Sequence, residues 1–426
     1  MTLAIFLAVL IGSVVLGLPV AFALLLSGVA LMVHQGLFSA DILAQALVNG
    51  VDNFSLIAVP FFLIAGETMS VGGLSKRIVR LALALVGHRK GGLGYVAIIT
   101  SVVLAGLSGS AVADAAALIA ILLPMMRKAN YPETASIGLL ASGGIIAPII
   151  PPSLPFIIIG VTGNISIAKL FLAGIAPGLM MGLALMATWW VIVRNKPLEV
   201  APKSDHAEVV AAFRDGIWAL FLPVIIIGGI KSGAFTPTEA AVVAAVYAIT
   251  ISVLVYRELT MATFYEILVK SARATAMVMF LVGCAMVASW LITVAQLPQQ
   301  VAGLLEPLID SPRVLMLAIM ILVLMIGMVM DLSPTILILV PLLMPVVRMA
   351  GIDPVYFGLM FVMNTSIGLI TPPVGTVLNV VCGVGKIPFE IAIRGVAPFV
   401  AVYILLLGLF IAFPQLVTMP LYWMTN

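Results

Sequence analysis

Two short polar segments interrupt otherwise apolar stretches of this 426-residue chain. Ser110 and Asp114 lie in the first segment, and Asp331 and Thr335 occupy the matching positions 221 residues later. Each segment therefore offers one carboxylate and one hydroxyl at positions i and i+4, which lie on one face of a helix. Oxygen ligands of this kind suit a hard cation such as Na⁺.

The first segment also has a simpler interpretation. Ser108, Gly109 and Ser110 are small residues, and small residues let membrane helices pack closely. Packing and cation binding both stay open for these three positions. Asp114 and Asp331 favour a binding site, because an ionisable group at membrane depth is costly and is a functional candidate by default.

Each polar segment is followed by an apolar stretch that a Pro-Pro pair interrupts. Pro151-Pro152 ends the motif SGGIIAPIIPPS, and Pro372-Pro373 lies in NTSIGLITPPVG. Proline lacks an N–H, so each pair removes helix bonds to the carbonyls four residues earlier. The carbonyls that lose these bonds are those of Ala147, Pro148, Gly368 and Leu369. Such carbonyls can hold Na⁺, while a facing half-helix N-terminus favours an anionic substrate group. A plain proline kink is the alternative.

The matching positions belong to a duplication of the whole arrangement. Five residues recur at an offset of 221, namely Gly106, Pro124, Arg127, Pro151 and Pro152 as Gly327, Pro345, Arg348, Pro372 and Pro373. Broken helices at equivalent places of two membrane repeats are the best sequence indication of a transporter's binding site.

The composition places these segments in a membrane. Hydrophobic residues make up 63% of the chain and charged residues 9%, against about 25% charged in soluble domains. The net charge of +3 comes from loop Lys and Arg and argues against nucleic-acid binding. Two cysteines predict neither a disulfide framework nor a Cys metal site. The first basic residue is Lys76, so the N-terminus is not expected to be a cleaved signal peptide.

The sequence predicts an all-α polytopic membrane protein. Spanning the bilayer takes roughly 20 apolar residues, and the candidate spans are 2–16, 18–34, 53–72, 133–163, 168–193, 215–231, 237–256, 272–294, 355–384 and 390–413. Two longer stretches with small or polar centres, 92–127 and 312–348, predict re-entrant hairpins that enter the membrane and return. Segments 39–51 and 259–270 are amphipathic and predict helices along the membrane surface. Residues 195–213 form a polar linker.

The distribution of basic residues predicts the orientation. With the N-terminus outside, sixteen Lys and Arg fall in inside loops and four outside, which satisfies the positive-inside rule. An odd number of crossings separates the hairpins. The first therefore enters from the cytoplasm and the second from the periplasm, which gives inverted-topology repeats.

The chain resembles the large membrane subunit (permease) of TRAP transporters, the tripartite ATP-independent periplasmic solute importers. Four stretches carry the resemblance: NGVDNFSLIAVPFFLIAGE from Asn49, GLSGSAVAD from Gly106, SGGIIAPIIPPS from Ser142 and ITPPVG from Ile370. The likeness runs from about residue 3 to the C-terminus. It is closest to the branch that serves 2,3-diketo-L-gulonate and related sugar acids.

The resemblance implies a Na⁺-driven elevator in the bacterial inner membrane. A transport domain of hairpins and broken helices would slide against a scaffold, importing an organic acid such as a sugar acid or dicarboxylate. A periplasmic solute-binding protein would deliver the solute, and a separate small subunit with four spans would brace the scaffold. No cofactor is expected besides Na⁺ as the coupling ion, and the chain is not expected to be an enzyme.

The resemblance also implies site residues. Na⁺ ligands are expected around Ser108, Ser110, Gly143, Gly144, Pro148, Asp331, Ser333, Thr335, Thr365, Gly368 and Thr371. The substrate is expected between the tips, near Asn364, Ser366, Pro152 and Asp114. No Arg or Lys is expected at membrane depth to pair with a substrate carboxylate, so half-helix dipoles and hydroxyls would bind it. Glu67 is expected near the cytoplasmic interface.

The predicted division of the chain follows the repeats. Scaffold spans with a surface arm take residues 1–91 and 214–311, and a hairpin with a broken helix takes 92–166 and 312–388. A further span takes 167–194 in the first repeat, and 389–426 form the last span and C-terminus. The cytoplasmic linker 195–213 joins the halves.

Two other functions are compatible with parts of this pattern. A stand-alone Na⁺/anion symporter would use similar inverted repeats without a binding protein. An intramembrane aspartyl protease would use Asp114 and Asp331 as a dyad, which requires two carboxylates close enough to share a proton. Each Asp instead matches a hydroxyl residue in the other repeat, which disfavours the protease.

Overall fold

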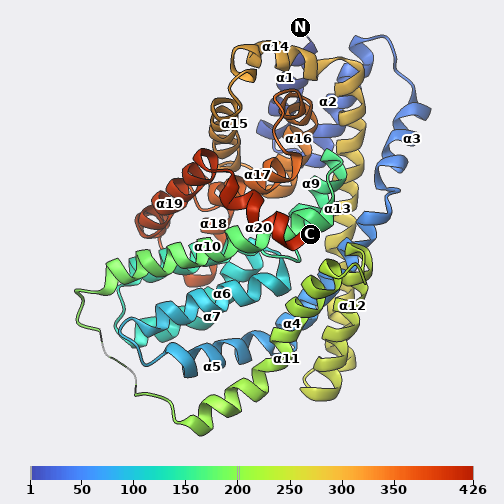
Figure 1. Cartoon of the computed structure of the whole chain (residues 1–426). Helices are drawn as coiled ribbons and strands as arrows, with labels where there is room; N and C mark the ends of the chain where they lie inside the picture. The colour runs from blue at the N-terminus through green and yellow to red at the C-terminus, as the bar shows by residue number, and fades with distance from the viewer. Residues whose placement is uncertain (1, 199, 201, 426) are drawn as a thin grey trace.

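The computed structural model describes residues 2–198, 200 and 202–425, and within them every regular element is helical. Figure 1 shows the N-terminus beside α1 and α14, and the C-terminus at the end of α20. Because every regular element among the described residues is helical, the structure confirms the predicted all-α class.

The helices fall into two successive halves. The first half contains α1 (Thr2–Val15), α2 (Val20–His34), α3 (Ala40–Val51), η1 (Phe54–Ile57), α4 (Ala58–Val71), α5 (Leu74–Val86), α6 (Gly92–Ser108), α7 (Ala111–Lys128), α8 (Glu133–Gly144), α9 (Leu154–Gly163) and α10 (Ile167–Val193). The second half contains α11 (His206–Lys231), α12 (Pro237–Thr250), η2 (Ile251–Val255), α13 (Met261–Val294), α14 (Leu297–Ile309), α15 (Pro312–Gly327), α16 (Leu332–Met349), α17 (Pro354–Gly368), α18 (Thr376–Gly385), α19 (Phe389–Ala412) and α20 (Gln415–Thr425).

The duplication is visible in the backbone as well as in the sequence. Helix α16 begins and ends exactly one repeat offset after α7, and α17 begins one offset after α8. Left-handed backbone conformations recur in the same way, at Gly36 and Arg257 and again at Asn130 and Gly351. Conformations of this kind are uncommon outside glycine, so their recurrence shows that both halves share one chain path.

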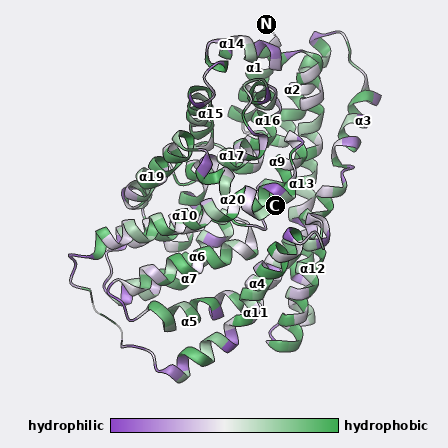
Figure 2. Ribbon diagram, viewed as in Figure 1, coloured by the Kyte–Doolittle hydropathy of each residue, from purple (hydrophilic) through white to green (hydrophobic). Residues whose placement is uncertain are grey.

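The helices have the length and composition of membrane spans. Within the described residues, seven segments could cross a bilayer: Phe54–Val71, Ile167–Val193, His206–Lys231, Pro237–Val255, Met261–Val294, Leu332–Met349 and Phe389–Ala412. Figure 2 shows apolar residues along most helices and hydrophilic residues mainly at helix ends and in loops. Helix α16 is among the seven, so the re-entrant course of the second hairpin stays a prediction.

The helices pack in two groups. Helix α13 packs along α2, α3 and α4, and α4 packs along α12. The other group combines the two helical hairpins, α6–α7 and α15–α16, with the interrupted helices α8–α9 and α17–α18. Figure 1 shows α13 beside α2 and α3, with α6, α7 and α10 crossing the other side of the molecule. Helices α10 and α19 pack against the hairpin group, on α6 and α8 respectively.

The two repeats interlock within the hairpin group. Helix α7 of the first repeat packs on α18 of the second, and α16 packs on α9. Arg127 on α7 donates to the carbonyl of Gly385 at the end of α18 (3.2 Å). Arg348 on α16 donates to the carbonyl of Gly163 at the end of α9 (3.0 Å). A cation at a helix C-terminus complements the carbonyl dipoles there. These two contacts, of Arg127 with Gly385 and of Arg348 with Gly163, are here called the arginine clasps, and they connect the two repeats.

Two predicted boundaries are wrong. The expected surface helix 259–270 is the beginning of α13, a single helix of 34 residues. The first repeat breaks at the matching place, where Asn53 accepts a hydrogen bond from the Ser55 N–H (2.9 Å) and starts η1. The second repeat has Ala274 there, a strong helix former. The predicted linker 195–213 is also too long, because α11 begins at His206 behind its N-cap Asp205.

Candidate functional site

The first hairpin turns between α6 and α7 at residues 108–111, here called the first tip. Gly109 has φ of +62°, and a Cβ there would lie 2.6 Å from the Pro152 carbonyl oxygen, so this position requires glycine. Ser110 is the N-cap of α7, and its hydroxyl accepts a hydrogen bond from the Ala113 N–H (3.4 Å). The tip therefore sits directly on the Pro-Pro segment of its own repeat.

The second hairpin turns between α15 and α16 at residues 327–332, here called the second tip. Asp331 is the N-cap of α16 and accepts a hydrogen bond from the Leu332 N–H (2.9 Å). The two predicted tips thus present matching cap residues, a hydroxyl in the first repeat and a carboxylate in the second. Side chains with oxygen acceptors are preferred at N-caps because the first helical N–H groups lack partners.

The predicted interruption of two helices at the Pro-Pro pairs is confirmed. The chain leaves α8 after Gly144 and resumes as α9 at Leu154, and it leaves α17 after Gly368 and resumes as α18 at Thr376. The Gly375 N–H donates to the Met328 carbonyl (3.0 Å), which joins the second segment to the second tip. A Cβ at Gly368 would lie 2.6 Å from the Gly327 carbonyl carbon, so helix and hairpin touch through backbone.

Most of the carbonyls that lose a helix hydrogen bond because of the prolines accept another hydrogen bond instead. Ser153 donates to the Pro148 oxygen (2.5 Å), and the Val377 N–H donates to the Leu369 oxygen (3.1 Å). The Gly368 oxygen accepts from the Thr371 N–H (2.9 Å). The expectation that these carbonyls are free for a cation therefore needs correction. Each oxygen has two lone pairs, so cation binding uses the second pair only.

Both tips and both interrupted segments meet at a small cavity of about 100 Å³, here called the tip cavity. Four of the predicted ligand residues line it, namely Ser110, Pro148, Asp331 and Ser333. A water molecule occupies roughly 30 Å³ in the liquid, so the space suits a cation with a few waters. A six-carbon acid is too large for it. The carboxylate of Asp331 gives this cavity its charge.

Four other predicted hydroxyls are buried, and each donates to the carbonyl four residues earlier in its own segment. They are Thr335, Thr365, Ser366 and Thr371. Donation of this kind is common for Ser and Thr in helices. These four residues line neither the tip cavity nor the second cavity described below. Their hydroxyl oxygens keep acceptor capacity toward a cation, but the structure does not bring them to these cavities.

The predicted glycines have close packing partners. A Cβ at Gly144 would lie 2.7 Å from the Ala115 backbone nitrogen, and a Cβ at Gly143 would clash with the Ser101 hydroxyl. The same holds for Gly368, as described above. Small residues here let interrupted helices approach the hairpins, so packing explains all three without a ligand.

Three residues predicted to contact substrate are buried and do not line the tip cavity. The Asn364 amide donates to the Met320 carbonyl (2.5 Å), and its Oδ1 has no partner among the described residues. Ser366 and Pro152 are likewise buried and line neither cavity. Their role in binding substrate stays a prediction.

A second cavity, of about 490 Å³, lies beside the first tip and is here called the side cavity. Ser108, Ser110 and Asp114 line it from the hairpin, and Glu67 and Lys270 line it from α4 and α13. The Lys270 ammonium lies 2.6 Å from the Glu67 carboxylate. Sequence reasoning missed Lys270, because residue 270 was expected on a separate surface helix and its partner is 203 positions away.

Comparison with known proteins identifies the family. A model described as the DctM component of the tripartite ATP-independent periplasmic transporters matches residues 7–416. The chain belongs to this family. It is therefore a multi-pass transporter of the inner membrane and not an enzyme, which removes the protease alternative.

Curated relatives support the same assignment over nearly the whole length. The permease is 58% identical to the 2,3-diketo-L-gulonate TRAP transporter large permease protein YiaN of Escherichia coli K12, covering 99% of this chain and 100% of the relative. It is 41% identical to the sialic acid TRAP transporter large permease protein SiaM of Vibrio cholerae, with 95% of each chain covered. It is 38% identical to the C4-dicarboxylate TRAP transporter large permease protein DctM of Pseudomonas aeruginosa, covering 87% of this chain and 88% of the relative.

A solved structure shares the fold at low sequence identity. The Alcanivorax borkumensis YdaH transporter superposes with a TM-score of 0.66 and 15% identity, covering 89% of the permease and 91% of that chain. The likeness concerns the fold alone.

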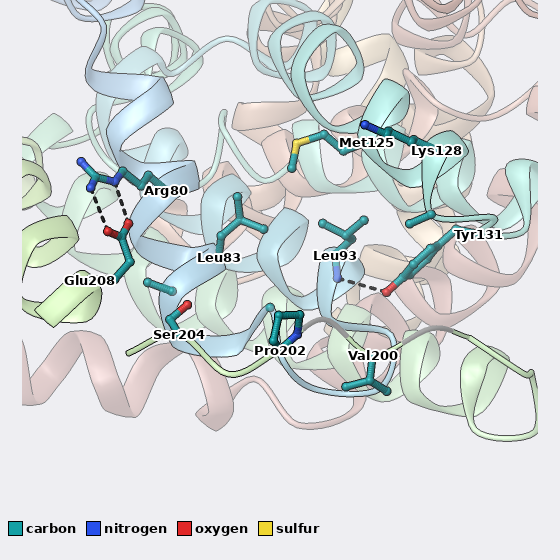
Figure 3. A pocket seen from close by; sticks show the side chains of 13 residues that line it. Arg80, Leu83, Leu93, Met125, Lys128, Tyr131, Val200, Pro202, Ser204 and Glu208 are labelled. Atoms are coloured by element: carbon teal, nitrogen blue, oxygen red, sulfur yellow. Dashed lines mark hydrogen bonds and ion pairs between the residues drawn. The ribbon is translucent and has the colours of Figure 1, made fainter. Parts of the chain in front are cut away.

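A third cavity of the permease, of about 800 Å³, lies away from both tips. Figure 3 shows it between α5, the base of the first hairpin and the linker residues Val200, Pro202 and Ser204. Arg80 donates to both carboxylate oxygens of Glu208 (2.9 and 3.1 Å) at one end. None of the predicted site residues lines it.

Proposed function

We propose that this permease is the large subunit of a Na⁺-driven importer of an organic acid, with a sugar acid as the solute. The observation that carries the proposal is the tip cavity, where the Asp331 carboxylate, two hydroxyls and the Pro148 segment converge from both repeats. The N-termini of α7 and α16 also face this cavity. Their positive dipole ends favour an anion, so Asp331 supplies the negative charge that a bound cation needs.

The solute class is inferred from the relatives. Those named above carry 2,3-diketo-L-gulonate, sialic acid and C4-dicarboxylates in their names, and each of these solutes bears a carboxylate. The relative at 58% identity is named for 2,3-diketo-L-gulonate. A sugar acid of this type is therefore the solute to test first.

The mechanism proposed is an elevator. The hairpins re-enter the membrane from opposite sides, the interlocked hairpin group moves as one body, and the α2–α4, α12 and α13 group stays fixed. The clasps of Arg127 and Arg348 support movement as one body, because they tie each repeat to the other. A small four-span subunit braces the fixed group, and a periplasmic binding protein delivers the solute.

The coupling ion is tested by reconstituting the complete complex in proteoliposomes. An inward Na⁺ gradient is expected to drive 2,3-diketo-L-gulonate uptake, and an equal K⁺ gradient is not. Asp331→Ala and Ser110→Ala are expected to abolish the Na⁺-dependent part. Asp353→Ala is a matched control, because Asp353 is also an N-cap, accepting from the Tyr356 N–H (2.7 Å), and it lies outside the tip cavity. Normal Na⁺-driven uptake by both tip variants would refute the proposal.

Movement of the two groups is tested with a cross-link. A Cβ at Gly66 on α4 would lie 3.5 Å from the Ser108 Cα at the first tip, so cysteines at the two positions would be close neighbours. In a background without Cys284 and Cys382, oxidised Gly66→Cys/Ser108→Cys is expected to stop uptake, and reduction is expected to restore it. Full uptake by the cross-linked protein would contradict the elevator.

The stand-alone symporter is the competing function. The same proteoliposomes with the permease alone distinguish the two. Robust solute uptake without the small subunit and the binding protein would favour the symporter.

A further inference from the structure

The side cavity has the size and lining of a solute site. Ligand sites commonly measure about 300–1,000 Å³, with apolar walls and a few convergent polar groups, and the side cavity measures about 490 Å³. Its walls include Phe62, Leu63, Met69, Leu104 and Leu107. The tip cavity, at about 100 Å³, has room for an ion only. A sugar acid that lies next to the ion therefore fits on the side-cavity face of the first tip.

Lys270 is the basic residue among those that line the side cavity. Its side chain is 69% exposed and reaches Glu67, whose side chain is 23% exposed. An ammonium group has three donors, so Lys270 can bind a second carboxylate beside Glu67 or in its place. The opposite repeat lacks this pair, because Asn49 and Ala288 stand at the matching positions.

Asp114 on α7 lines the same cavity as Glu67 and Lys270. It is 4% exposed, and its Oδ1 accepts a hydrogen bond from the Ser108 hydroxyl. Its Oδ2 has no hydrogen-bond partner among the described residues. A buried acceptor without a partner is costly, so Oδ2 gains a hydrogen bond if the cavity wall opens enough for a solute hydroxyl to reach it. A second solute carboxylate would instead be repelled.

We propose that the side cavity binds a hydroxylated monocarboxylate, with its carboxylate on Lys270 and a hydroxyl on Asp114. Glu67 competes with the solute for Lys270. This competition gives the Lys270 ammonium a partner when the cavity is empty, and it promotes release of the bound solute. Asp114 selects sugar acids against dicarboxylates. This inference rests on the proposed function and adds its specificity-determining residues.

Equilibrium binding of 2,3-diketo-L-gulonate to the purified permease with its small subunit, without the periplasmic binding protein, tests the role of Lys270. Lys270→Gln is expected to weaken binding about tenfold, the size of one charge-assisted hydrogen bond at a partly exposed site. Glu67→Gln is expected to tighten binding about threefold, because Lys270 loses its competitor. The double variant is expected to behave like Lys270→Gln. If the pair were merely structural, both single variants would weaken binding and the double variant would recover.

A matched control is available in the same part of the molecule. Arg77 and Glu258 form an ion pair of the same length, 2.6 Å, and neither residue lines the side cavity. Arg77→Gln is expected to leave 2,3-diketo-L-gulonate affinity unchanged. An equal loss in Arg77→Gln and Lys270→Gln would assign the effect to general disturbance of the helices and overturn the inference.

Solute selection tests Asp114. With succinate as the competing probe, Asp114→Asn is expected to reduce the preference for 2,3-diketo-L-gulonate at least about tenfold. An unchanged preference would overturn the role of Asp114, and unchanged affinity in Lys270→Gln and Glu67→Gln would overturn that of Lys270. Failure of the wild-type complex to take up 2,3-diketo-L-gulonate would instead refute the proposed sugar-acid function, and this inference with it.

Discussion

The second helices of the two hairpins, α7 and α16, begin at matching positions, but the two tips differ in where the carboxylate stands. In the second repeat Asp331 is the N-cap and faces the tip cavity, whereas in the first repeat the cap is Ser110 and Asp114 lies one turn inside the helix. This shift of the carboxylate by one helical turn changes which of the two cavities it lines. The duplication therefore supplies two equivalent pairs of positions, and the carboxylate and the hydroxyl are exchanged between them. Under the proposed function, this exchange assigns Asp331 to the ion and Asp114 to the solute.

The largest expected effect comes from neutralising each carboxylate in turn. Asp331→Asn is expected to reduce Na⁺-dependent uptake at least about a hundredfold, equivalent to ~2.7 kcal/mol, because the tip cavity loses its charge. Asp114→Asn is expected to retain the Na⁺ dependence and to lose solute affinity. Uptake rates measured against Na⁺ and solute concentrations separate the two effects. The same loss of Na⁺ dependence in both variants would show that the tips are not specialised.

A smaller effect is expected where the interrupted helices meet the hairpins. The position of Gly368 is occupied by Ala147 in the first repeat. A Cβ at residue 368 would come within 2.6 Å of Gly327 backbone, so Gly368→Ala is expected to cost ~1–3 kcal/mol through overpacking. Thermal unfolding of the purified permease measures this cost.

Gly383 provides the control for that substitution. A Cβ at residue 383 would meet nothing within 4 Å, and alanine is the better helix former. Gly383→Ala is expected to leave the unfolding temperature unchanged or to raise it slightly. If Gly368→Ala were equally harmless, the close approach of helix and hairpin would not restrict the second repeat.

The smallest expected effect concerns the two arginine clasps. Arg127 has an ion-pair partner in Glu133 at 2.5 Å in addition to its carbonyl, whereas Arg348 contacts the carbonyls of Gly163 and Asn164. Each Arg→Gln change is expected to cost ~1 kcal/mol, measured as a drop in unfolding temperature. Because the clasps lie in different places and share no partner, their costs are expected to add in the double variant. A coupling well beyond additivity would show that the two clasps act as one.

The sequence predicts the broken and hairpin elements well because Gly and Pro mark their ends. Gly109 has a left-handed backbone conformation that favours glycine, and each Pro-Pro pair interrupts a helix. The 221-residue offset repeats the Pro-Pro pairs, whereas Met330 stands at the position that matches Gly109. The role of a residue is harder to predict from the sequence when it depends on the direction in which the side chain points. Thr335, Thr365 and Thr371 have the composition of ligands, yet each donates to its own helix or segment.

Contacts between segments far apart in the sequence are the other feature that the sequence does not predict. Lys270, the partner of Glu67, lies on the continuous helix α13. That helix runs through Ala274, where the first repeat has Asn53 and starts a new element. Helix propensity at one residue is a weak guide to a 34-residue helix. The side cavity is therefore a product of packing that no local pattern reveals.

The crossed clasps have a consequence for biosynthesis. During synthesis, Arg127 cannot form its hydrogen bond until the Gly385 carbonyl, 258 residues further along the chain, has been made. At translation rates of about 5–20 residues per second, that delay is roughly 10–50 s. During this interval the first hairpin lacks its eventual neighbour, and the insertion machinery or lipid must shelter it. A chain cut in the loop between the halves is then expected to regain function when both pieces are made together, because each piece completes the other.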